Sequence, residues 1–486
     1  MPNKREELSS QPVEQSIPVG VRTRRRSTER KVMTDPLEAP ISRRALVKGA
    51  IGAAGVAAVG SLGSPGTAGA RIRRKNATKV VVMTGTGELS KGYVEAFGKI
   101  NPNIEIEVIP PDAARFQAMM AAGQPPDIWR TQAPLVPQLA SRGKLLNLDP
   151  YFQNSDALRP ADLTPANDYY RFKDGKQGVG PRYCMVKDWS PDGTVWINME
   201  LFRKTGIQIP GPRDEWSYDD LWEIAKKLKA KNKSVKWIID LANSYAWVDR
   251  DVMVKLAAVG GSLYPKDFRS INLTKNKAAL EAFRYLFQYS QQKMDLSPAN
   301  PNPDGWSGPG FTTGKVAMTH YCYWFNGMMT GNATASAFAR MLTAPVWKKG
   351  KKVDPTITAT GWVVSATTKN PDAAWEVFEW YMGKGPARDR AGGGWGVPAQ
   401  LSLFDRLPAS TPVQRNAKRT LLVELPKSKV PIQYNPNLVG LGDSTAVAAA
   451  YKKYLLDAAN GKISFNELMK RVERDTNAAI QVGLRG

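Results

Sequence analysis

The stretch KVVVMTGTG, residues 79–87, decides the fold class of this chain. Residues 79–83 form an unbroken, largely β-branched run, the pattern of a strand buried on both faces of a parallel sheet, and the glycines that follow end it. A helix is predicted from Ser90, because apolar side chains recur there at three- and four-residue spacing, and residues 104–108 alternate as a second strand. This order of strand, helix and strand predicts an α/β fold.

The alternation of strands and helices continues to about residue 190, where the pattern of the sequence changes. A turn at 189–193, WSPDG, precedes a further predicted strand at 194–198. We therefore expect the chain to pass from one domain to another near this turn. A helix start is predicted at Ser217, because Asp220 occupies the capping-box position three residues later.

Residues 1–70 have the features of an export leader. They carry 11 basic and 6 acidic side chains, and the segment SRRALVK at 42–48 resembles a twin-arginine signal. A Gly- and Ala-rich apolar run follows at 49–62, and the A-x-A pattern at 68–70 predicts cleavage near Ala70. We therefore predict an exported protein, periplasmic or on the cell surface. Its mature chain of 486 − 70 = 416 residues is long enough for two domains.

The composition excludes several kinds of chemistry and partner. The net charge is +24, and removal of the leader, with its 11 − 6 = +5, leaves +19 spread along the chain without a basic stripe or an RNA-binding motif. Nucleic acid is therefore not an expected partner. His320 is the one histidine and Cys184 and Cys322 are the two cysteines, which excludes multi-histidine zinc sites and iron–sulfur clusters. We predict no cofactor, no metal and no catalytic residue.

Five stretches carry a resemblance to a known family through their order and spacing. They are VVVMTGTG at 80–87, QPPDI at 124–128, VWINMELF at 195–202 followed by the helix start after Trp216, FTTGKVAM at 311–318, and GGGWGVP at 392–398. Together they resemble an extracellular solute-binding protein of the carbohydrate-binding type, the maltose-binding-like partner of an ABC importer.

The resemblance implies a two-lobed periplasmic-binding-protein fold of type II, with a ligand cleft between lobes that are joined by a multi-segment hinge. Lobe I would contain 78–190 and about 358–385, and lobe II would contain 191–357 and about 386–486. The resemblance also implies a monomer without enzymatic activity. Such a protein captures a small solute, here a sugar or oligosaccharide, and delivers it to an ABC transporter permease.

Sugar sites combine aromatic faces with side chains that donate and accept hydrogen bonds. Loop positions and the resemblance together predict a set of ligand-binding residues. They are Thr86, Glu88, Trp129, Arg130, Gln132, Trp189, Tyr245, Trp247, Trp324, Trp362 and Trp395. Asp188 and Asp249 are further polar candidates. Tryptophan also commonly packs in protein cores, and for Trp129 and Trp247 core packing is an equally good explanation.

Other functions stay open at this point. An acidic or phosphorylated solute, such as glycerol phosphate or a uronic acid, could be bound with the help of Arg130 or Arg182. A secreted glycoside hydrolase would need two carboxylates at its site, and the sequence offers no convincing acid/base pair. A disulfide between Cys184 and Cys322 also stays open. The resemblance places these cysteines in different lobes, where a bond would restrain the hinge.

Overall fold

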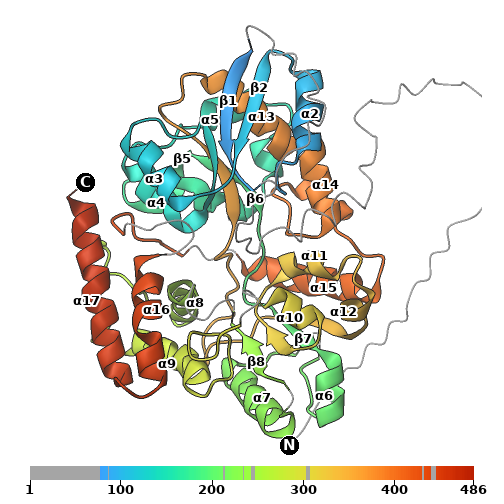
Figure 1. Cartoon of the computed structure of the whole chain (residues 1–486), viewed down its shortest axis with the longest axis vertical. Coiled ribbons are helices and arrows are strands. Elements are labelled where there is room, and N and C mark those ends of the chain that lie inside the picture. The colour runs from blue at the N-terminus through green and yellow to red at the C-terminus, as the bar shows by residue number, and fades with distance from the viewer. Residues whose placement is uncertain are drawn as a thin grey trace, which may run out of the picture. The chain divides into compact units, whose positions relative to one another are not determined.

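Two larger β-sheets organise the part of the chain that the structure describes (Figure 1). The first sheet has the strand order β2-β1-β3-β11-β6, and the second has the order β10-β7-β9-β8. We call the parts of the chain built on these sheets lobe I and lobe II. The predicted leader and the predicted site residues Thr86 and Tyr245 lie outside the described residues. The computed structural model describes residues 77–85, 87–211, 214–233, 235–241, 247–302, 307–428, 432–438 and 445–485.

The first sheet begins with the predicted βαβ unit, which is confirmed. Strand β1 pairs in parallel with β2 and β3, whereas β11 runs antiparallel to β3 and β6. Helix α2 begins after Ser90, whose hydroxyl accepts a hydrogen bond from the backbone N–H of Tyr93. It packs on helix α13 through the rings of Phe97 and Trp380, whose centroids are 5.2 Å apart. The strands of this sheet are β1 (Thr78–Met83), β2 (Ile104–Ile109), β3 (Ile128–Gln132), β6 (Cys184–Asp188) and β11 (Thr360–Val364).

The second sheet contains the strand predicted after the turn at 189–193. The capping box predicted at Ser217 is also confirmed: its hydroxyl accepts a hydrogen bond from Asp220 N at 3.1 Å, and the Asp220 carboxylate accepts one from Ser217 N at 2.7 Å. The predicted α/β class therefore describes both sheets. The strands are β7 (Val195–Asn198), β8 (Trp237–Asp240), β9 (Val316–Thr319) and β10 (Ala339–Leu342).

Helices and short strands complete the two lobes. The α-helices are α2 (Lys91–Ile100), α3 (Ala113–Ala121), α4 (Val136–Ser141), α5 (Asp149–Gln153), α6 (Met199–Thr205), α7 (Tyr218–Lys231), α8 (Val248–Ala258), α9 (Lys277–Gln291), α10 (Gly308–Thr312), α11 (Asn326–Met329), α12 (Ala333–Phe338), α13 (Pro371–Gly383), α14 (Gly385–Gly393), α15 (Pro412–Glu424), α16 (Ala446–Ala459) and α17 (Phe465–Leu484). The 3-10 helices are η1 (Ala133–Leu135), η2 (Pro160–Asp162), η3 (Pro165–Tyr170), η4 (Tyr323–Phe325), η5 (Leu401–Arg406) and η6 (Leu425–Lys427), and a hairpin joins β4 (Arg171–Lys173) to β5 (Lys176–Arg182). Among the described helices, none is long and apolar enough to cross a membrane.

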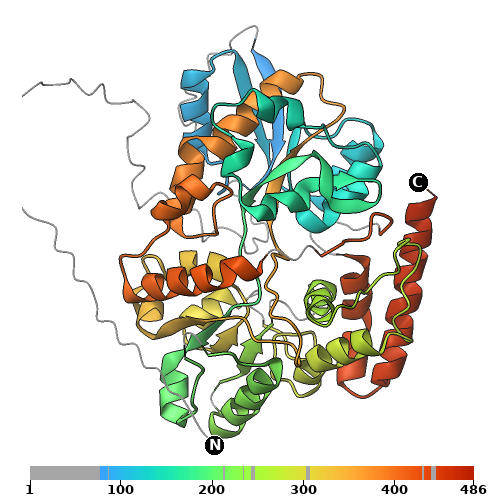
Figure 2. The same ribbon diagram turned by 180° about the vertical axis from the view of Figure 1, so that it is seen from behind.

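Three chain segments pass between the two lobes (Figure 2). The first joins β6 to β7, and the second joins β10 to β11. The third joins α14, which packs on α13, to α15, which packs on β10. The first and third segments exchange two backbone hydrogen bonds, between Trp189 and Val397. The predicted multi-segment hinge is therefore present, whereas the residue boundaries predicted for the lobes stay a prediction.

Buried carboxylates bind the first and second crossing segments to each other. Asp192 Oδ2 accepts hydrogen bonds from the backbone N–H groups of Ile357 and Thr358, at 2.6 and 2.7 Å. The hydroxyl of Thr358 donates a third bond to the same oxygen at 2.8 Å. In return, Asp354 Oδ1 accepts a hydrogen bond from Gly193 N at 2.5 Å. Each segment thus satisfies backbone N–H groups of the other, which buried backbone requires.

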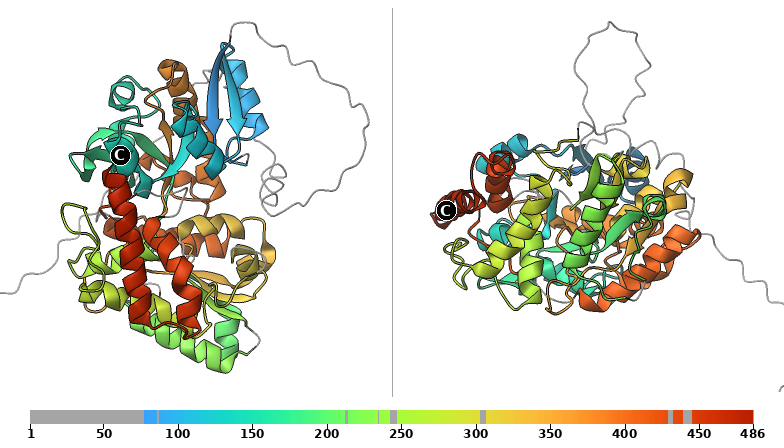
Figure 3. Two further views of the ribbon diagram at one scale, coloured as in Figure 1. Left: turned by 60° about the vertical axis from the view of Figure 1, so that its left-hand side comes forward. Right: turned by 90° about the horizontal axis from the view of Figure 1, so that it is seen from below.

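The C-terminal helix contacts lobe I through its last turn. Helices α16 and α17 run side by side (Figure 3). Arg142, which follows α4, donates hydrogen bonds to the carbonyl oxygens of Pro436 at 3.0 Å and Gly483 at 2.7 Å. A Cβ atom at Gly483 would lie 1.9 Å from the carbonyl oxygen of Asn437. The absence of a side chain at this position therefore allows the close approach.

Gly483→Ala should lower the melting temperature, because its methyl group would overlap the Asn437 carbonyl and displace backbone. We expect a loss of about 1–3 kcal/mol. Gly98→Ala in α2 is the matched control: nothing lies within 4 Å of a Cβ built there. In a helix interior this control change should stabilise by about 0.5–1 kcal/mol. Thermal unfolding followed by circular dichroism measures both, and equal melting temperatures would contradict the close approach.

Asp192→Ala should destabilise strongly, because it leaves the N–H groups of Ile357 and Thr358 without their acceptor. We expect a loss of about 3 kcal/mol in urea unfolding at neutral pH. Asp192→Asn keeps a side-chain oxygen that can accept from both N–H groups, so it should lose less than half as much. Equal losses in the two variants would show that the charge of the side chain, rather than its capacity to accept, stabilises the crossing.

Candidate binding site

Four charged side chains form a compact group at strands β3 and β6 of lobe I and the loop that follows β1. Glu88 Oε1 lies 3.3 Å from Arg130 Nε and 3.3 Å from Lys187 Nζ. Lys187 also pairs with Asp188, and the hydroxyl of Thr360 donates to Asp188 Oδ1 at 2.8 Å. We call Glu88, Arg130, Lys187 and Asp188 the charged quartet. Its formal charges sum to zero, because each carboxylate is matched by a cation.

The surroundings of Glu88 keep it ionised. Burial raises the pKa of its carboxyl group, but the positive charges of Lys187 and Arg130 and a hydrogen bond from Thr84 lower it further, to about 2. For Lys187, burial lowers the pKa, and the neighbouring Asp188 and Glu88 raise it above the ordinary value. An unpaired buried ammonium group would be costly, so the two carboxylates are what allow Lys187 to lie inside the protein.

Two tryptophan rings lie parallel to each other beside the charged quartet. The centroids of Trp324 and Trp395 are 6.4 Å apart, and their planes differ by 13°. Trp395 is 38% exposed, and the backbone N–H of Trp324 donates to Ser190 Oγ at 3.2 Å. A Cβ atom at Gly396 would lie 2.6 Å from Asp188 Cβ, so the loop that carries Trp395 runs directly against the quartet. The Trp324–Trp395 pair and the charged quartet therefore lie next to each other.

Three other tryptophans that the sequence predicts for the site are buried in the protein. Trp129 is buried and packs on Phe116, with ring centroids 5.5 Å apart. Trp362 is buried and stacks on Tyr381 at 3.8 Å with an angle of 6°. Trp189 is buried too, and its indole N–H donates to the carbonyl oxygen of Pro398 at 3.2 Å. Trp129 and Trp362 thus pack within lobe I, whereas Trp189 joins two crossing segments. Direct contact between these rings and a solute stays a prediction.

Gln132 has a buried partner from lobe II that the sequence analysis missed. Arg250 of α8 donates from Nη1 to Gln132 Oε1 at 2.6 Å and to the carbonyl oxygen of Ile357 at 2.9 Å. Its guanidinium lies 5.8 Å from the ring centroid of Trp247, the predicted site residue that precedes α8. Arg250 thus joins both lobes and a crossing segment. The signal in the sequence was three consecutive charged residues, 249–251, at the start of a helix whose later residues are apolar except for Lys255.

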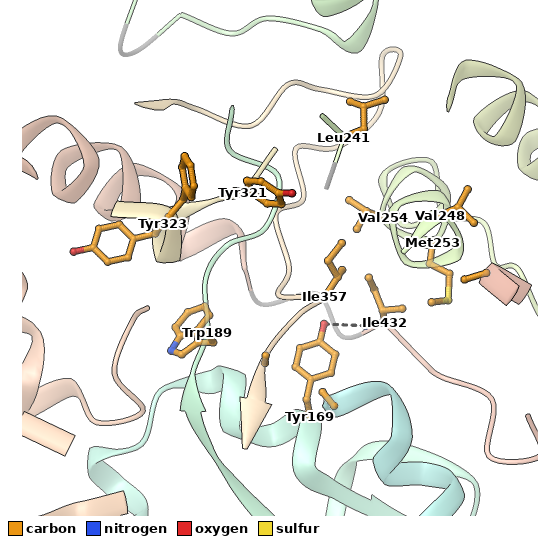
Figure 4. Close-up of a cluster of buried hydrophobic side chains, with 14 of the residues drawn as sticks. Tyr169, Trp189, Leu241, Val248, Met253, Val254, Tyr321, Tyr323, Ile357 and Ile432 are labelled. Carbon is orange, nitrogen blue, oxygen red and sulfur yellow. Dashed lines mark hydrogen bonds between the residues drawn. The ribbon is translucent and has the colours of Figure 1, made fainter. Parts of the chain in front are cut away.

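Apolar packing surrounds these polar contacts (Figure 4). Tyr169 of lobe I, Ile357 of the second crossing segment and Val254 of α8 belong to one buried cluster. The hydroxyl of Tyr169 accepts a hydrogen bond from the backbone N–H of Ile432 at 3.1 Å. Burial of these side chains excludes water from the crossing, which strengthens its hydrogen bonds.

His320 and the two cysteines are the remaining candidates for metal or redox chemistry. The described residues contain no group of three or more His, Cys, Asp or Glu side chains that could bind a metal ion. Cys184 and Cys322 are buried and free, so the disulfide that the sequence left open is not formed. His320 is buried, and burial lowers its pKa below the ordinary value.

Comparison with known proteins identifies a family for this chain and solved structures that share its fold. A family model described as bacterial extracellular solute-binding protein matches residues 82–387, and no curated protein matches the chain. An ABC substrate-binding protein from Listeria monocytogenes, in complex with cycloalternan, is 20% identical, with a TM-score of 0.65 over 83% of this chain and 98% of that one. A binding protein from B. animalis subsp. lactis, in complex with beta-1,6-galactobiose, is 18% identical, with a TM-score of 0.63 over 84% and 98%. A solute-binding protein from Agrobacterium vitis, with bound D-mannitol, is 17% identical, with a TM-score of 0.63 over 83% and 98%. The shared fold is the two-lobed one.

Glu88→Gln should reveal the stability that the ionised carboxylate contributes. Because the folded pKa of about 2 lies below the ordinary value of 4.5, this contribution is present above pH 4.5 and is lost as the pH falls toward 2. At neutral pH we expect the variant to lose about 1.5–3 kcal/mol. The difference from the unmodified protein should shrink between pH 4.5 and 2, as measured by thermal unfolding.

Glu95→Gln is the control for this change. Glu95 pairs with Lys91 on the exposed face of α2, at 3.6 Å. Its replacement should change stability by less than about 0.5 kcal/mol at any pH. A Glu88→Gln difference that stays constant down to pH 2 would contradict the ionised, paired state of Glu88.

Proposed function

Because the chain belongs to the bacterial extracellular solute-binding protein family, we propose that it binds a carbohydrate by closure of its two lobes and delivers it to the permease of an ABC importer. The observation that carries the proposal is the parallel pair of Trp324 and Trp395 beside the charged quartet. Sugar rings present apolar C–H faces that stack on aromatic rings, and hydroxyl groups that hydrogen-bond to charged and polar side chains. The pair and the quartet supply both kinds of contact in one place.

The pairing of the charges favours a neutral sugar over an acidic solute. Arg130 lies against Glu88, and Arg182 lies 3.6 Å from an oxygen of Asp168 and donates to the carbonyl oxygen of Asn167 at 2.9 Å. An anionic solute would compete with these carboxylates for the same cations. A neutral solute can accept hydrogen bonds from the cations and donate to the carboxylates without breaking the ion pairs.

The same pairing argues for binding without hydrolysis. A glycosidase needs one carboxylic acid that is protonated at the working pH, and this requires a raised pKa. The carboxylates beside the tryptophan pair are Glu88 and Asp188, and the neighbouring cations lower the pKa of Glu88. Glu88 is therefore suited to accept hydrogen bonds from hydroxyl groups and unsuited to donate a proton to a leaving group.

The proposed role includes export and lobe geometry as the sequence predicts them. A twin-arginine-like leader over 1–70, cleaved near Ala70, would place the mature protein outside the cytoplasm. A monomer with lobe I at 78–190 and about 358–385, and lobe II at 191–357 and about 386–486, would close on the solute about the crossing segments. Thr86 and Tyr245 complete the proposed contact set.

The function is tested by thermal unfolding of the full chain against mono-, di- and oligosaccharides, uronic acids and glycerol phosphate. A solute that binds only the folded protein at a hundredfold excess over its Kd stabilises by about 2.7 kcal/mol. We expect neutral sugars to raise the melting temperature and the acidic solutes to leave it unchanged. Turnover of a glycoside, without a shift in melting temperature for any solute, would contradict the proposed binding function.

Trp324→Ala and Trp395→Ala should each weaken binding of the stabilising sugar by about 1–3 kcal/mol, because each removes one stacking face. Trp395→Phe keeps an aromatic face and should lose less. Trp222→Phe is the control, since Trp222 packs on Tyr289 in lobe II, away from the pair. Isothermal titration calorimetry measures all four variants, and unchanged affinity in both alanine variants would place the site elsewhere.

A further inference from the structure

A cavity of about 270 Å³ in lobe II has no role in the proposed sugar site. It lies between the edge strand β10 and helix α15. Its lining consists of Arg340, Pro412, Arg415, Asn416 and Arg419. Three of these five residues carry guanidinium groups, and none carries a carboxylate.

Hydrogen bonds hold two of the residues that line this cavity in position. Asn416 accepts from the backbone N–H of Met341 at 2.8 Å and donates to the carbonyl oxygen of the same residue at 3.2 Å, which joins α15 to β10. Arg415 Nη1 donates to the carbonyl oxygens of Ser410 at 2.7 Å and Ala409 at 3.3 Å. These backbone acceptors orient the Arg415 side chain. Because they carry no negative charge, the charge of its guanidinium group is not neutralised.

The positive charges reinforce one another here. Arg415 and Arg419 stand four residues apart on one face of α15, a spacing at which like charges destabilise a helix. Pro412, the first residue of α15, also lines the cavity. Within the described part of the chain, no ion pair involves Arg340, Arg415 or Arg419.

This arrangement contrasts with the charged quartet, where each cation has an internal carboxylate. We propose that the cavity lined by Arg340, Arg415 and Arg419 is a binding site for a phosphate-like oxyanion group. Guanidinium groups bind such oxyanions through paired N–H donors, and three of them match a tetrahedral anion with oxygens on every side. The volume falls below the range of about 300–1,000 Å³ of pockets for larger ligands, which suits a single anionic group.

The oxyanion can belong to a free anion or to the headgroup of an anionic lipid. Leu422, three residues beyond Arg419 on α15, is 50% exposed and extends the basic face with an apolar side chain. Basic and apolar side chains on one helix face are also the chemistry of contact with an anionic membrane surface. The experiment therefore uses inorganic phosphate and lipid vesicles as separate probes.

The first probe is inorganic phosphate, titrated calorimetrically into the full chain at constant ionic strength with chloride as the replaced anion. We expect saturable binding of one phosphate per chain, weakened at least about tenfold in Arg340→Gln/Arg419→Gln. Arg203→Gln is the matched control, because it removes an exposed positive charge from helix α6 of the same lobe and Arg203 does not line the cavity. It should leave phosphate affinity within about twofold.

The second probe is a vesicle of phosphatidylglycerol, with phosphatidylcholine as the uncharged comparison. Binding to phosphatidylglycerol that phosphate displaces, and that the double variant loses, identifies a lipid headgroup as one source of the oxyanion. Phosphate binding without vesicle binding identifies a free anion. Absence of saturable binding to both probes, or equal binding by the double variant, would overturn the proposal. The sugar affinity of the double variant should match that of the unmodified chain, so this result is separable from a failure of the sugar site.

Discussion

The Asp192 carboxylate, bonded to the backbone of Ile357 and Thr358, is the contact on which the rest of the structure depends. Two sheets that share no strand are joined covalently by the segments that cross between them, and the buried backbone groups of these segments need partners. Asp192 and Asp354 supply those partners reciprocally. The first crossing segment also carries Asp188 of the charged quartet and Ser190, which accepts the Trp324 N–H. The hinge and the proposed sugar site are therefore built from one stretch of chain, so movement at the hinge must change the site.

The charged quartet shows why a strongly basic protein can offer a neutral site. Lys187 is buried at the end of β6, and its ammonium group is stable there only because Glu88 and Asp188 lie against it. The same carboxylates then limit what a solute can gain from Lys187 and Arg130. In the proposed site, a neutral polyol would donate to the carboxylates and accept from the cations without separating the ion pairs. The pairing that makes burial possible would then also disfavour anionic solutes.

Local patterns in the sequence predicted the βαβ start, the capping box at Ser217 and the crossing near residue 190, because each depends on neighbouring residues. Loop positions and the family resemblance together also marked Glu88, Trp324 and Trp395 as candidate ligand contacts, and contact of these residues with a solute stays a prediction. The pairing of Glu88 with Lys187, and of Gln132 with Arg250, joins residues about 100 positions apart, and no local pattern encodes it. The same limit applies to Trp362. Strand alternation shows that its ring points to one face of a sheet, but only the packed fold shows that Tyr381 covers that face.

The net charge of this chain does not predict the charge of its individual sites. The net charge of +19 carried by residues 71–486 predicts neither the neutral quartet nor the arginine cavity. In the quartet, burial forces cations and carboxylates together, because an unpaired buried charge is costly. Beside α15 of lobe II water solvates each guanidinium, so nothing forces a carboxylate into the cavity. Arginines that converge there without internal partners keep their binding capacity for a group that comes from outside the chain. Burial thus separates the two sets: the buried charges of the quartet are paired within the chain, whereas the exposed arginines of the cavity have no ion-pair partner among the described residues.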